Sequence, residues 1–565
     1  MCRAFRTHLR ICCISLVLTL VLFSPIRAGE APGDQKPLRF SLTDTYGRRV
    51  SSDDYKGVPV LVEFGACWCG GCQGEAAKLG RIAADFRPRG LAVLHAVAGD
   101  NELGSLEYQK HYRLNIVNVL DSNREFEKTY NRDGWPFVIV ADRSGNVVYA
   151  AGGLQDSASL ESLLGKVLTR APAAGVKTLE GIPYMPATLK RSGESDKPRL
   201  RERFPSVACG PDGRVYLAFT SNRNGNDDVF ARVFDGKVWS EDHPVAATKA
   251  DEYDVTVAVD EKNRAWFSWT SNADGKNYNI FVACVADFTQ IVKSEQVTRA
   301  GDDAMHGRLA CGPDGTVWLT YYKWGFEQGT SRDREIYLRR FNGKSWSGEI
   351  QVSPTDVPSY EDHADPRVAA KGRSAIVCWS WDFHQPKGYP PDARDPTIFI
   401  RSVGPDLKLD AARVLSGKNI DTMPALALDD GGAPWCAWES IAWSSRLRTY
   451  AKSLCVSRAD GPGGAGTALS GGLQNVCTPC LVRAPGGLLT AVWAENQTGT
   501  QWLLKRADLD PKTKRWTAVK TLVADGNPRF PSIACDAKGS LWVAYSRETT
   551  AGREIAVENF PLRQE

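Results

Sequence analysis

The spacing of apolar residues in the first third of the chain predicts alternating strands and helices. Residues 58–64 (VPVLVEF) and 91–98 are nearly continuous apolar runs, which is typical of strands buried on both faces. Residues 72–86 instead carry apolar side chains at helical spacing. Further predicted elements are helices over 103–112 and 160–168 and a hairpin formed by 137–141 and 147–151. The alternation predicts an α/β domain over residues 36–170, with a central sheet covered by helices.

Beyond residue 204 the pattern changes to one that repeats seven times. Each copy predicts a short strand, a turn rich in Gly or Asp and an aromatic strand, and most copies continue into a third and usually a fourth strand. Four strands in a repeat of about 50 to 59 residues are typical of β-propeller blades. The copies begin at Phe204, Asp254, His306, Asp365, Met423, Thr478 and Phe530. We therefore expect an all-β propeller over residues 204–562, with seven blades, or six if one copy is degenerate.

Residues 171–203 connect the two patterns. The segment begins with small residues around Pro172 and becomes polar over 190–203, which is typical of a linker. The last repeat ends after its third strand, near Phe560. The end of the linker could therefore supply the fourth strand that closes the ring.

Residues 1–28 are expected to be a signal peptide. Arg3, Arg6 and Arg10 precede an apolar run over 11–23, and Ala28 is a small residue at which cleavage could occur. The run is shorter than the about 20 apolar residues that a bilayer span needs. A retained anchor is the alternative. We expect an exported protein, periplasmic or extracellular, with no membrane span once the signal is removed.

Length, charge and cysteine content narrow the function classes. A chain of 565 residues exceeds what one hydrophobic core usually serves, and its net charge of +4 gives no sign of a nucleic-acid partner. The even number of cysteines that follow the signal segment could form disulfides in an oxidising compartment. However, Cys209, Cys311 and Cys535 occupy one repeat position, which is typical of small core residues.

The strongest chemical signal lies where the first apolar strand runs into the first helix. Residues 65–75 (GACWCGGCQGE) hold Cys69 and Cys72, which are close enough to form a disulfide. We expect Cys69 at the helix N-terminus, where unpaired amides and the helix dipole favour a thiolate. Cys72 lies one turn further and should resolve a mixed disulfide. Trp68 can cover the pair on one side.

Two other interpretations of this segment were weighed. Half of a zinc site would need two more Cys or His ligands, and His95 and His111 are isolated. We therefore predict no metal and no cofactor besides the redox-active disulfide. A peroxidase of the same fold would need a PxxxTxxC segment, and EFGACWC has neither the Pro nor the Thr. Cys67 is interpreted as a small buried residue, with a regulatory thiol as the alternative.

Two motifs in this order resemble the TlpA- and ResA-like thioredoxins. They are VLVEFGACWCGGCQGE (60–75) and YNRDGWPFVIVADRSGNVV (130–148), and the resemblance covers about residues 36–170. It implies a thioredoxin-like fold and thiol–disulfide oxidoreductase activity, with Cys69 as the nucleophile and Cys72 as the resolving thiol. It also implies that Pro136 is a cis-proline that faces the disulfide and offers backbone to an extended substrate. An ordinary trans turn proline is the alternative.

The same resemblance singles out two glutamates. Glu75 matches an acidic position that lies near the thiols in ResA-like proteins, and Glu63 falls where thioredoxins keep a buried acid beneath the disulfide. A buried carboxyl group with a raised pKa can shuttle the proton that Cys72 loses and regains. The alternative is a solvated Glu75 on the helix surface and Glu63 at a strand edge.

The sequence also departs from this family in three ways. Gly65 replaces an aromatic residue, and Gly70-Gly71 replaces the common Gly-Pro or Pro-Pro. Trp135 is bulkier than the usual residue before the proline and could narrow the substrate groove. Because residues between the thiols help set the reduction potential, the direction of electron flow stays open.

The repeats resemble sialidase/BNR-type propellers, most clearly in residues 221–241. The catalytic set of sialidases cannot be placed in the sequence, so this resemblance implies the fold alone. Arg308 and Arg367 share one repeat position and could face a carboxylate near the ring axis, or form salt bridges at strand edges. Further candidates on the same propeller face are His306, His363 and Trp381. Such a face suits a glycan or a protein segment, or is a solvated set of loops.

These observations predict an exported thiol–disulfide oxidoreductase acting through the CGGC pair. Its partners would be a protein thiol or disulfide substrate and an unidentified redox protein, and its propeller would bind a partner or a glycan. The rival hypothesis is a sialidase-like, glycan-binding or glycan-acting propeller with a vestigial thioredoxin domain. A third is an interaction scaffold with neither activity.

Overall fold

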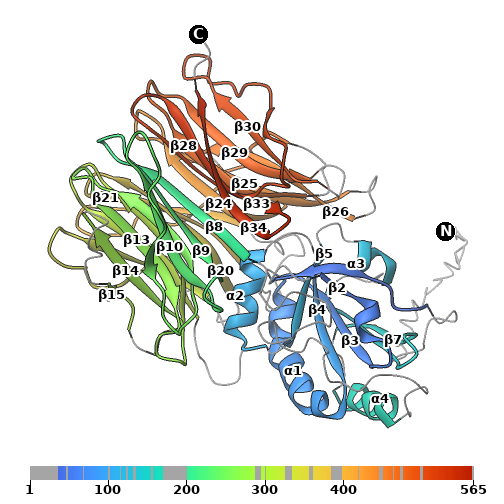
Figure 1. Cartoon of the computed structure of the whole chain (residues 1–565). Coiled ribbons are helices and arrows are strands. Elements are labelled where there is room, and N and C mark those ends of the chain that lie inside the picture. Colours follow the sequence, from blue (N-terminus) through green and yellow to red (C-terminus); the bar gives the residue numbers. More distant parts are fainter. Residues whose placement is uncertain are drawn as a thin grey trace, which may run out of the picture.

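The computed structural model places the N-terminal third of the chain against a larger set of β-sheets (Figure 1). It describes residues 36–169 and 200–562, apart from short internal stretches. The stretches left out are 46–48, 68, 99–101, 115, 122–124, 131–134, 154–156, 287–293, 300, 325–333, 356–360, 384–396, 418, 445–448, 462, 471–474 and 497–500. The expected signal peptide therefore lies outside the described residues.

The N-terminal domain is a seven-stranded mixed sheet with the order β2-β1-β5-β4-β3-β6-β7. Its strands are β1 (Ser41–Asp44), β2 (Arg49–Ser51), β3 (Val60–Gly65), β4 (Ala92–Ala98), β5 (Val117–Asp121), β6 (Phe137–Ala141) and β7 (Val147–Gly152). The central strand β3 is buried along its whole length because it pairs with β4 in parallel and with β6 antiparallel. Its side chains alternate between two apolar clusters, with Val62 in one and Leu61 in the other.

Helices cover this sheet, as the alternating pattern predicts. They are α1 (Gly70–Phe86), α2 (Glu102–His111), α3 (Glu125–Tyr130) and α4 (Ser157–Thr169), with 3₁₀ turns η1 (Ser52–Tyr55) and η2 (Arg87–Arg89). The three predicted helices are confirmed as α1, α2 and α4, and the predicted hairpin is confirmed as β6 and β7. α3, β1, β2 and β5 are additional to the predicted elements.

The C-terminal part consists of separate antiparallel sheets that follow the seven repeats. Five have four strands each, and a sixth sheet of seven strands joins the first and last repeats. The first three repeats form β8 (Leu200–Cys209), β9 (Val215–Ser221), β10 (Asp228–Phe234), β11 (His243–Ala246), β12 (Glu252–Val259), β13 (Ala265–Ser271), β14 (Asn279–Val285), β15 (Glu295–Gln296), β16 (Ala304–Cys311), β17 (Val317–Trp324), β18 (Arg334–Phe341) and β19 (Ile350–Gln351).

The remaining four repeats continue the same arrangement. They form β20 (Glu361–Lys371), β21 (Ser374–Phe383), β22 (Thr397–Val403), β23 (Arg413–Val414), β24 (Ile420–Leu428), β25 (Pro434–Ser444), β26 (Thr449–Arg458), β27 (Thr467–Ala468), β28 (Asn475–Arg483), β29 (Leu489–Asn496), β30 (Leu503–Leu509), β31 (Lys520–Val523), β32 (Arg529–Cys535), β33 (Ser540–Thr549) and β34 (Gly552–Pro561).

The first strands of the seven repeats contact one another in sequence, and β32 also contacts β8. Each of these strands has an irregular register where it pairs with the second strand. At that point each has one non-glycine residue in the left-handed region: Phe204, Asp254, His306, Asp365, Met423, Thr478 and Phe530. These are the residues with which the seven sequence copies begin, so one strained bulge marks every repeat.

The last repeat has three described strands. β34 pairs in parallel with the start of β8 through Gly552↔Leu200 and Arg553↔Arg201. The fourth strand expected from the linker falls on residues 171–199, which lie outside the described residues. What is described of the linker, residues 200–203, belongs to β8.

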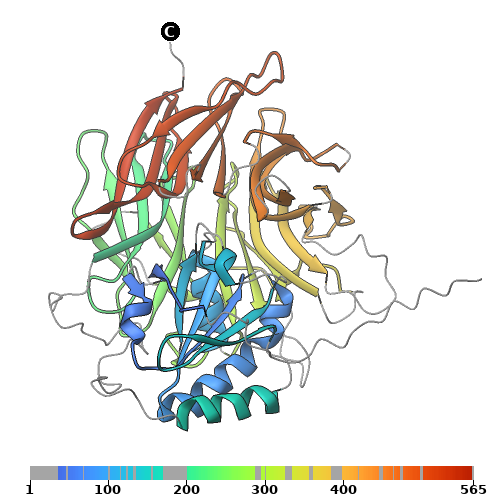
Figure 2. The same cartoon turned by 90° about the vertical axis from the view of Figure 1, so that its right-hand side faces the viewer.

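Helix α2 lies between the N-terminal sheet and the C-terminal sheets (Figure 1). Figure 2 shows the N-terminal domain in front of the C-terminal sheets. Leu106 of α2 belongs to the same apolar cluster as Phe204, Trp318 and Phe530. One apolar core is therefore shared by the two parts of the chain. Among the described residues, helices are too short or too polar to cross a membrane.

Candidate functional site

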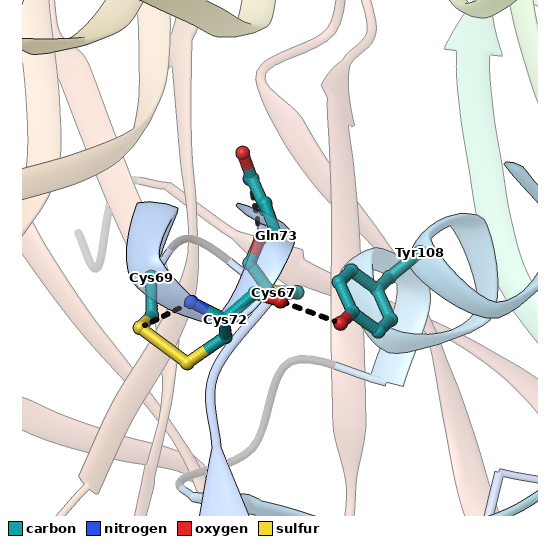
Figure 3. Close-up of a disulfide and its surroundings, with 5 residues drawn as sticks. All are labelled: Cys67, Cys69, Cys72, Gln73 and Tyr108. Atoms are coloured by element: carbon teal, nitrogen blue, oxygen red, sulfur yellow. Dashed lines mark hydrogen bonds between the residues drawn. A yellow bond between two sulfur atoms is a disulfide. The ribbon is translucent and has the colours of Figure 1, made fainter. Parts of the chain in front are cut away.

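A disulfide joins Cys69 and Cys72 where β3 gives way to α1 (Figure 3). The two Cα atoms are 5.3 Å apart, as the spacing of the pair predicts. Cys69 is the N-cap residue of α1, and its Sγ accepts a hydrogen bond from the Cys72 backbone N–H at 3.2 Å. The helix N-terminus thus directs a backbone donor at the sulfur of Cys69, which favours its thiolate when the pair is reduced.

The two sulfurs differ in their access to solvent. Cys69 is partly exposed, whereas Cys72 has no exposed surface. A substrate can therefore reach Cys69 first, and Cys72 is placed to attack the mixed disulfide from inside the domain.

Pro136 faces the start of α1 across a very short gap. The Trp135–Pro136 peptide bond is cis, as the resemblance predicts. A Cβ atom on Gly71 would lie 3.1 Å from Pro136 Cδ, so the second glycine of the CGGC segment lets this loop approach the helix closely. Trp135 packs against the apolar cluster of the sheet. Trp68 lies outside the described residues.

Glu63 lies beneath the disulfide on β3 and is fully buried. Burial raises the pKa of Glu63 to about 8, with a smaller contribution from the negative charge of Glu75. Glu75 borders the proline loop, since a Cβ on Gly153 would meet its Oε1 at 3.1 Å. The Gly153 N–H in turn donates to the Pro136 carbonyl at 2.7 Å. Of the two predicted glutamates, Glu75 is thus placed beside the proline loop.

Two residues near the pair were not predicted as site residues. The Tyr108 hydroxyl of α2 donates to the Cys72 carbonyl oxygen at 3.1 Å (Figure 3). His95 of β4 is fully buried, and its ring centroid lies 5.1 Å from that of Tyr108. The only sequence signal for His95 is one polar residue in the apolar run 91–98, and the signal for Tyr108 is weaker still.

The third thiol of the segment, Cys67, is buried. Burial raises the pKa of Cys67 to about 12, with Asp365 of β20 adding to the effect and Arg334 of β18 opposing it. Its carbonyl oxygen accepts a hydrogen bond from Gln73 Nε2 at 2.9 Å (Figure 3). A thiol with so high a pKa stays protonated at neutral pH, as expected for a small buried residue.

The outward face of α2 carries charges that pair with the C-terminal sheets. Glu102 Oε2 accepts from Arg553 at 2.6 Å and Oε1 from Arg203 at 3.4 Å. Burial raises the pKa of Glu102, but these two guanidinium groups lower it further, so it lies below its usual value.

The C-terminal end of α2 also forms ion pairs with the C-terminal part of the chain. Lys110 Nζ donates to Asp251 at 2.6 Å, and His111 lies 2.6 Å from Asp303. The His111 ring also stacks on Trp324, with centroids 3.5 Å apart. Charge pairing and aromatic stacking therefore hold α2 at both of its ends.

The predicted propeller-face residues lie inside the protein. His306 is buried, with Nδ1 3.3 Å from Glu107 of α2 and Nε2 2.9 Å from Arg367. Arg308 forms a bidentate salt bridge to Asp254, at 2.9 and 3.0 Å. Such a salt bridge is the alternative interpretation of Arg308 given from the sequence. The structure thus brings Arg308, Arg367 and His306 together, but around carboxylates that belong to the chain itself.

His363 and Trp381 pack elsewhere in this core. The Trp379 indole N–H donates to His363 Nδ1 at 3.0 Å, and the rings of His363 and Trp381 are 4.7 Å apart. Both residues are buried. Among the described residues, these two side chains are therefore packing groups between strands rather than an open binding surface.

One group of described residues has the chemistry of metal ligands. A carboxylate oxygen of Glu107, one of Asp254 and a ring nitrogen of His306 all lie within 4.8 Å of one another. However, Arg308 donates to Asp254, and both Arg308 and Arg367 contact His306. Two guanidinium cations already supply the positive charge that a metal ion would bring, so this group does not fit a metal.

A cavity of about 170 Å³ lies among the first strands of the C-terminal repeats. Residues from all seven of these strands line it: Phe204, Asp254, Arg308, Arg367, Met423, Thr478 and Phe530. Leu103 of α2 also lines the cavity. The helix therefore reaches the point where the repeats converge.

The N-terminal domain is thioredoxin-like, because its central strand runs directly into a helix that begins with a bonded cysteine pair. Residues 32–154 match the family model described as AhpC/TSA family. Two relatives named thiol-disulfide oxidoreductase ResA are each 26% identical to the chain. One, from Bacillus thuringiensis subsp. konkukian (strain 97-27), matches over 135 residues, 24% of this chain and 78% of the relative. The other, from Bacillus subtilis (strain 168), matches over 139 residues, which are 24% of this chain and 77% of that relative.

A solved structure is also similar to part of the chain. The thiol:disulfide interchange protein of the thioredoxin family from Chlorobium tepidum TLS is 23% identical, with a TM-score of 0.22. The match covers 24% of this chain and 99% of that one. These relatives concern the N-terminal domain alone.

Proposed function

We propose that this chain is an exported enzyme that exchanges protein disulfides through Cys69 and Cys72. One observation carries the proposal: the partly exposed Cys69 caps a helix and is bonded to the fully buried Cys72. An outer thiolate that attacks and an inner thiol that resolves are what disulfide exchange requires. The ResA relatives, which cover this domain, support the same activity.

The reaction follows from this arrangement. The Cys69 thiolate attacks a substrate disulfide and forms a mixed disulfide, releasing the first substrate thiolate. Cys72 then attacks Cys69 Sγ, which forms the Cys69–Cys72 disulfide and releases the second substrate thiolate. The substrate gains two electrons and the enzyme loses two, so a reduced redox protein must regenerate the dithiol, or the cycle runs in reverse with an oxidant. We propose that Pro136 and Trp135 line the groove for the extended substrate.

We propose that the C-terminal repeats form a seven-bladed propeller over residues 204–562. The closed sequence of contacts between first strands and the bulge shared by all seven repeats support this. The linker 171–203 would supply the strand that completes the last blade. The predicted signal peptide at residues 1–28 supports export.

The position of α2 favours a propeller whose mouth binds the redox domain of the same chain rather than a glycan. α2 contacts the residues that line the mouth, with Leu103 at the central cavity and Glu107 against His306. A glycan or protein ligand of the propeller would have to bind away from this position.

Insulin reduction driven by dithiothreitol tests the proposal. Cys69→Ser should abolish catalysis, because it removes the attacking thiolate, whereas Cys67→Ala should retain it, because Cys67 is buried and protonated. Full activity of Cys69→Ser would contradict the proposal. Turnover of a sialoside by a variant lacking both Cys69 and Cys72 would favour the rival glycan-acting hypothesis.

A further inference from the structure

A row of buried polar side chains crosses the sheet beneath Cys72. Glu63 of β3 is the register partner of His95 of β4, which is the partner of Asn118 of β5. Partners on neighbouring strands share one face of a sheet, so the three side chains lie on the same side. All three are at most 1% exposed. Buried polar groups cost free energy, so such a row calls for a function.

His95 borders the reacting sulfur. A Cβ atom on Gly65 would lie 2.9 Å from Cys72 Sγ and 3.1 Å from His95 Nε2. The thiol and the imidazole therefore flank one small space above Gly65. Any side chain at position 65 would fill that space, so the glycine that departs from the family pattern is what leaves the imidazole facing the sulfur.

Asn118 of β5 is the strand partner of His95 on the side away from β3. Its side chain raises the pKa of His95, in opposition to burial. Nε2 makes no hydrogen bond to a described residue, so its lone pair is available to the thiol when the ring hydrogen is on Nδ1.

The ionisable groups around this space differ in their readiness to accept a proton. Burial lowers the pKa of His95 to about 4, so its imidazole is neutral at pH 7. Burial and Glu75 raise the pKa of Glu63 to about 8, so Glu63 is mostly protonated. Burial also raises the pKa of Tyr108, on α2, well above its usual value. His95 therefore borders Cys72 Sγ with an imidazole that is unprotonated at neutral pH.

We propose that His95 is the general base that accepts the proton of Cys72, and that Asn118 is a positioning residue that orients the imidazole. This rests on the proposed disulfide exchange. In the mixed disulfide, the Cys72 S–H proton passes to Nε2 as the sulfur attacks Cys69 Sγ. The Cys69–Cys72 bond forms, the bond to the substrate breaks, and the substrate sulfur leaves with the electron pair. The imidazolium then returns its proton to the departing thiolate or to solvent. While the Cys72 sulfur carries negative charge, it attracts the imidazolium and so stabilises the protonated form of His95.

The reduced full-length protein reacting with 5,5′-dithiobis(2-nitrobenzoate) separates the two steps. Attack by Cys69 releases one thionitrobenzoate, and attack by Cys72 releases the second. His95→Gln should leave the first phase within about twofold of wild type and slow the second about 100-fold at pH 7, the usual contribution of a general base. The second phase of the variant should then rise with pH by about tenfold per pH unit, as for an unassisted thiol that reacts only as its thiolate.

Matched variants make the result decisive. Asn118→Ala should slow the second phase by a smaller factor, and Gly65→Ala should slow it by separating thiol and imidazole. Glu63→Gln should slow the second phase at pH 7 less than His95→Gln does. Subtracting the reaction of a Cys69→Ser/Cys72→Ser variant removes the signal of the other cysteines. Recovery of the Cys69–Cys72 disulfide and a cooperative melting transition show that each variant has folded, and Asn118→Ala carries the test if His95→Gln fails this check.

An unchanged second phase in the folded His95→Gln variant would overturn the proposal. So would a second phase that is slower in Glu63→Gln than in His95→Gln, because Glu63 would then be the main base. Loss of the first phase in the wild type is a different outcome, since it would overturn the proposed exchange activity itself.

Discussion

Glu63 shows how a single buried group links proton uptake to stability. In the unfolded chain its carboxyl group loses its proton near pH 4.5, whereas the folded domain holds the proton up to about pH 8. Between these values the folded state binds more protons than the unfolded state, so the free energy of unfolding falls as pH rises. Below about pH 4.5 both states are protonated and the penalty vanishes.

Glu63→Gln should remove this penalty because the amide carries no charge. At pH 5 variant and wild type should melt at nearly the same temperature, and at pH 7.5 the variant should be more stable, by at most about 4 kcal/mol. Calorimetry of the oxidised protein at both pH values checks this. The exposed Glu125→Gln serves as control and should show no such divergence. Equal gains at both pH values would show that the effect is packing rather than ionisation.

At the scale of one element, α2 has two faces with different partners. Its inward face donates from Tyr108 to Cys72, and its outward face places Leu106 in the core shared with the C-terminal sheets. Few apolar residues mark the outward face, because Glu102, Glu107 and Lys110 occupy it as well. A buried helix face that relies on charge pairs keeps its partners specific, because each charge needs its own counter-charge.

Leu106→Ala should destabilise the docking of the two parts. Leu106 has no exposed surface, and removing a fully buried leucine side chain typically costs about 2–5 kcal/mol. Leu163→Ala on α4 is a matched control, because Leu163 is only partly buried and packs within the N-terminal domain. Calorimetry should give the larger loss for Leu106→Ala. An equal or smaller loss would mean that the shared core contributes little to stability.

At the scale of the whole molecule, the charge network makes two domains into one cooperative unit. Arg203 donates to Asp227 at 2.8 and 3.0 Å as well as to Glu102, and it also donates to the carbonyl oxygen of Thr45. Nearly all of this network is buried, so salt should screen it far less than it screens surface pairs. We expect the intact protein to unfold in a single calorimetric transition.

Glu102→Gln should separate that transition into two. The substitution leaves Arg203 and Arg553 with less negative charge around them, and breaking a buried pair costs about 3–5 kcal/mol. Lys408→Gln is the control, since its pair with Asp406 is 87% exposed at the lysine and should contribute almost nothing. A single, unshifted transition for Glu102→Gln would show that docking does not depend on this network.

Some of this architecture could be predicted from the sequence because the signals are local. The cysteine spacing, the helix that starts beside it and the seven repeats all lie within short segments. The docking of α2 could not be predicted, since Glu102 and Arg553 are far apart in sequence. His95 was also missed as a site residue, because one histidine in an apolar strand resembles a core residue until the space above Gly65 is known. The opposite error concerned His363 and Trp381, whose aromatic rings suggested a binding surface but pack inside.

The two-faced α2 constrains any transfer of this redox module to another scaffold. A thioredoxin-like domain grafted in its place would dock only if it carried counterparts of the outward residues Glu102, Leu106, Lys110 and His111. To seat such a graft, an engineer would have to transplant the α2 sequence together with its inward Tyr108. The same coupling means that substitutions on α2 and on the C-terminal sheets that it contacts must stay compatible during evolution.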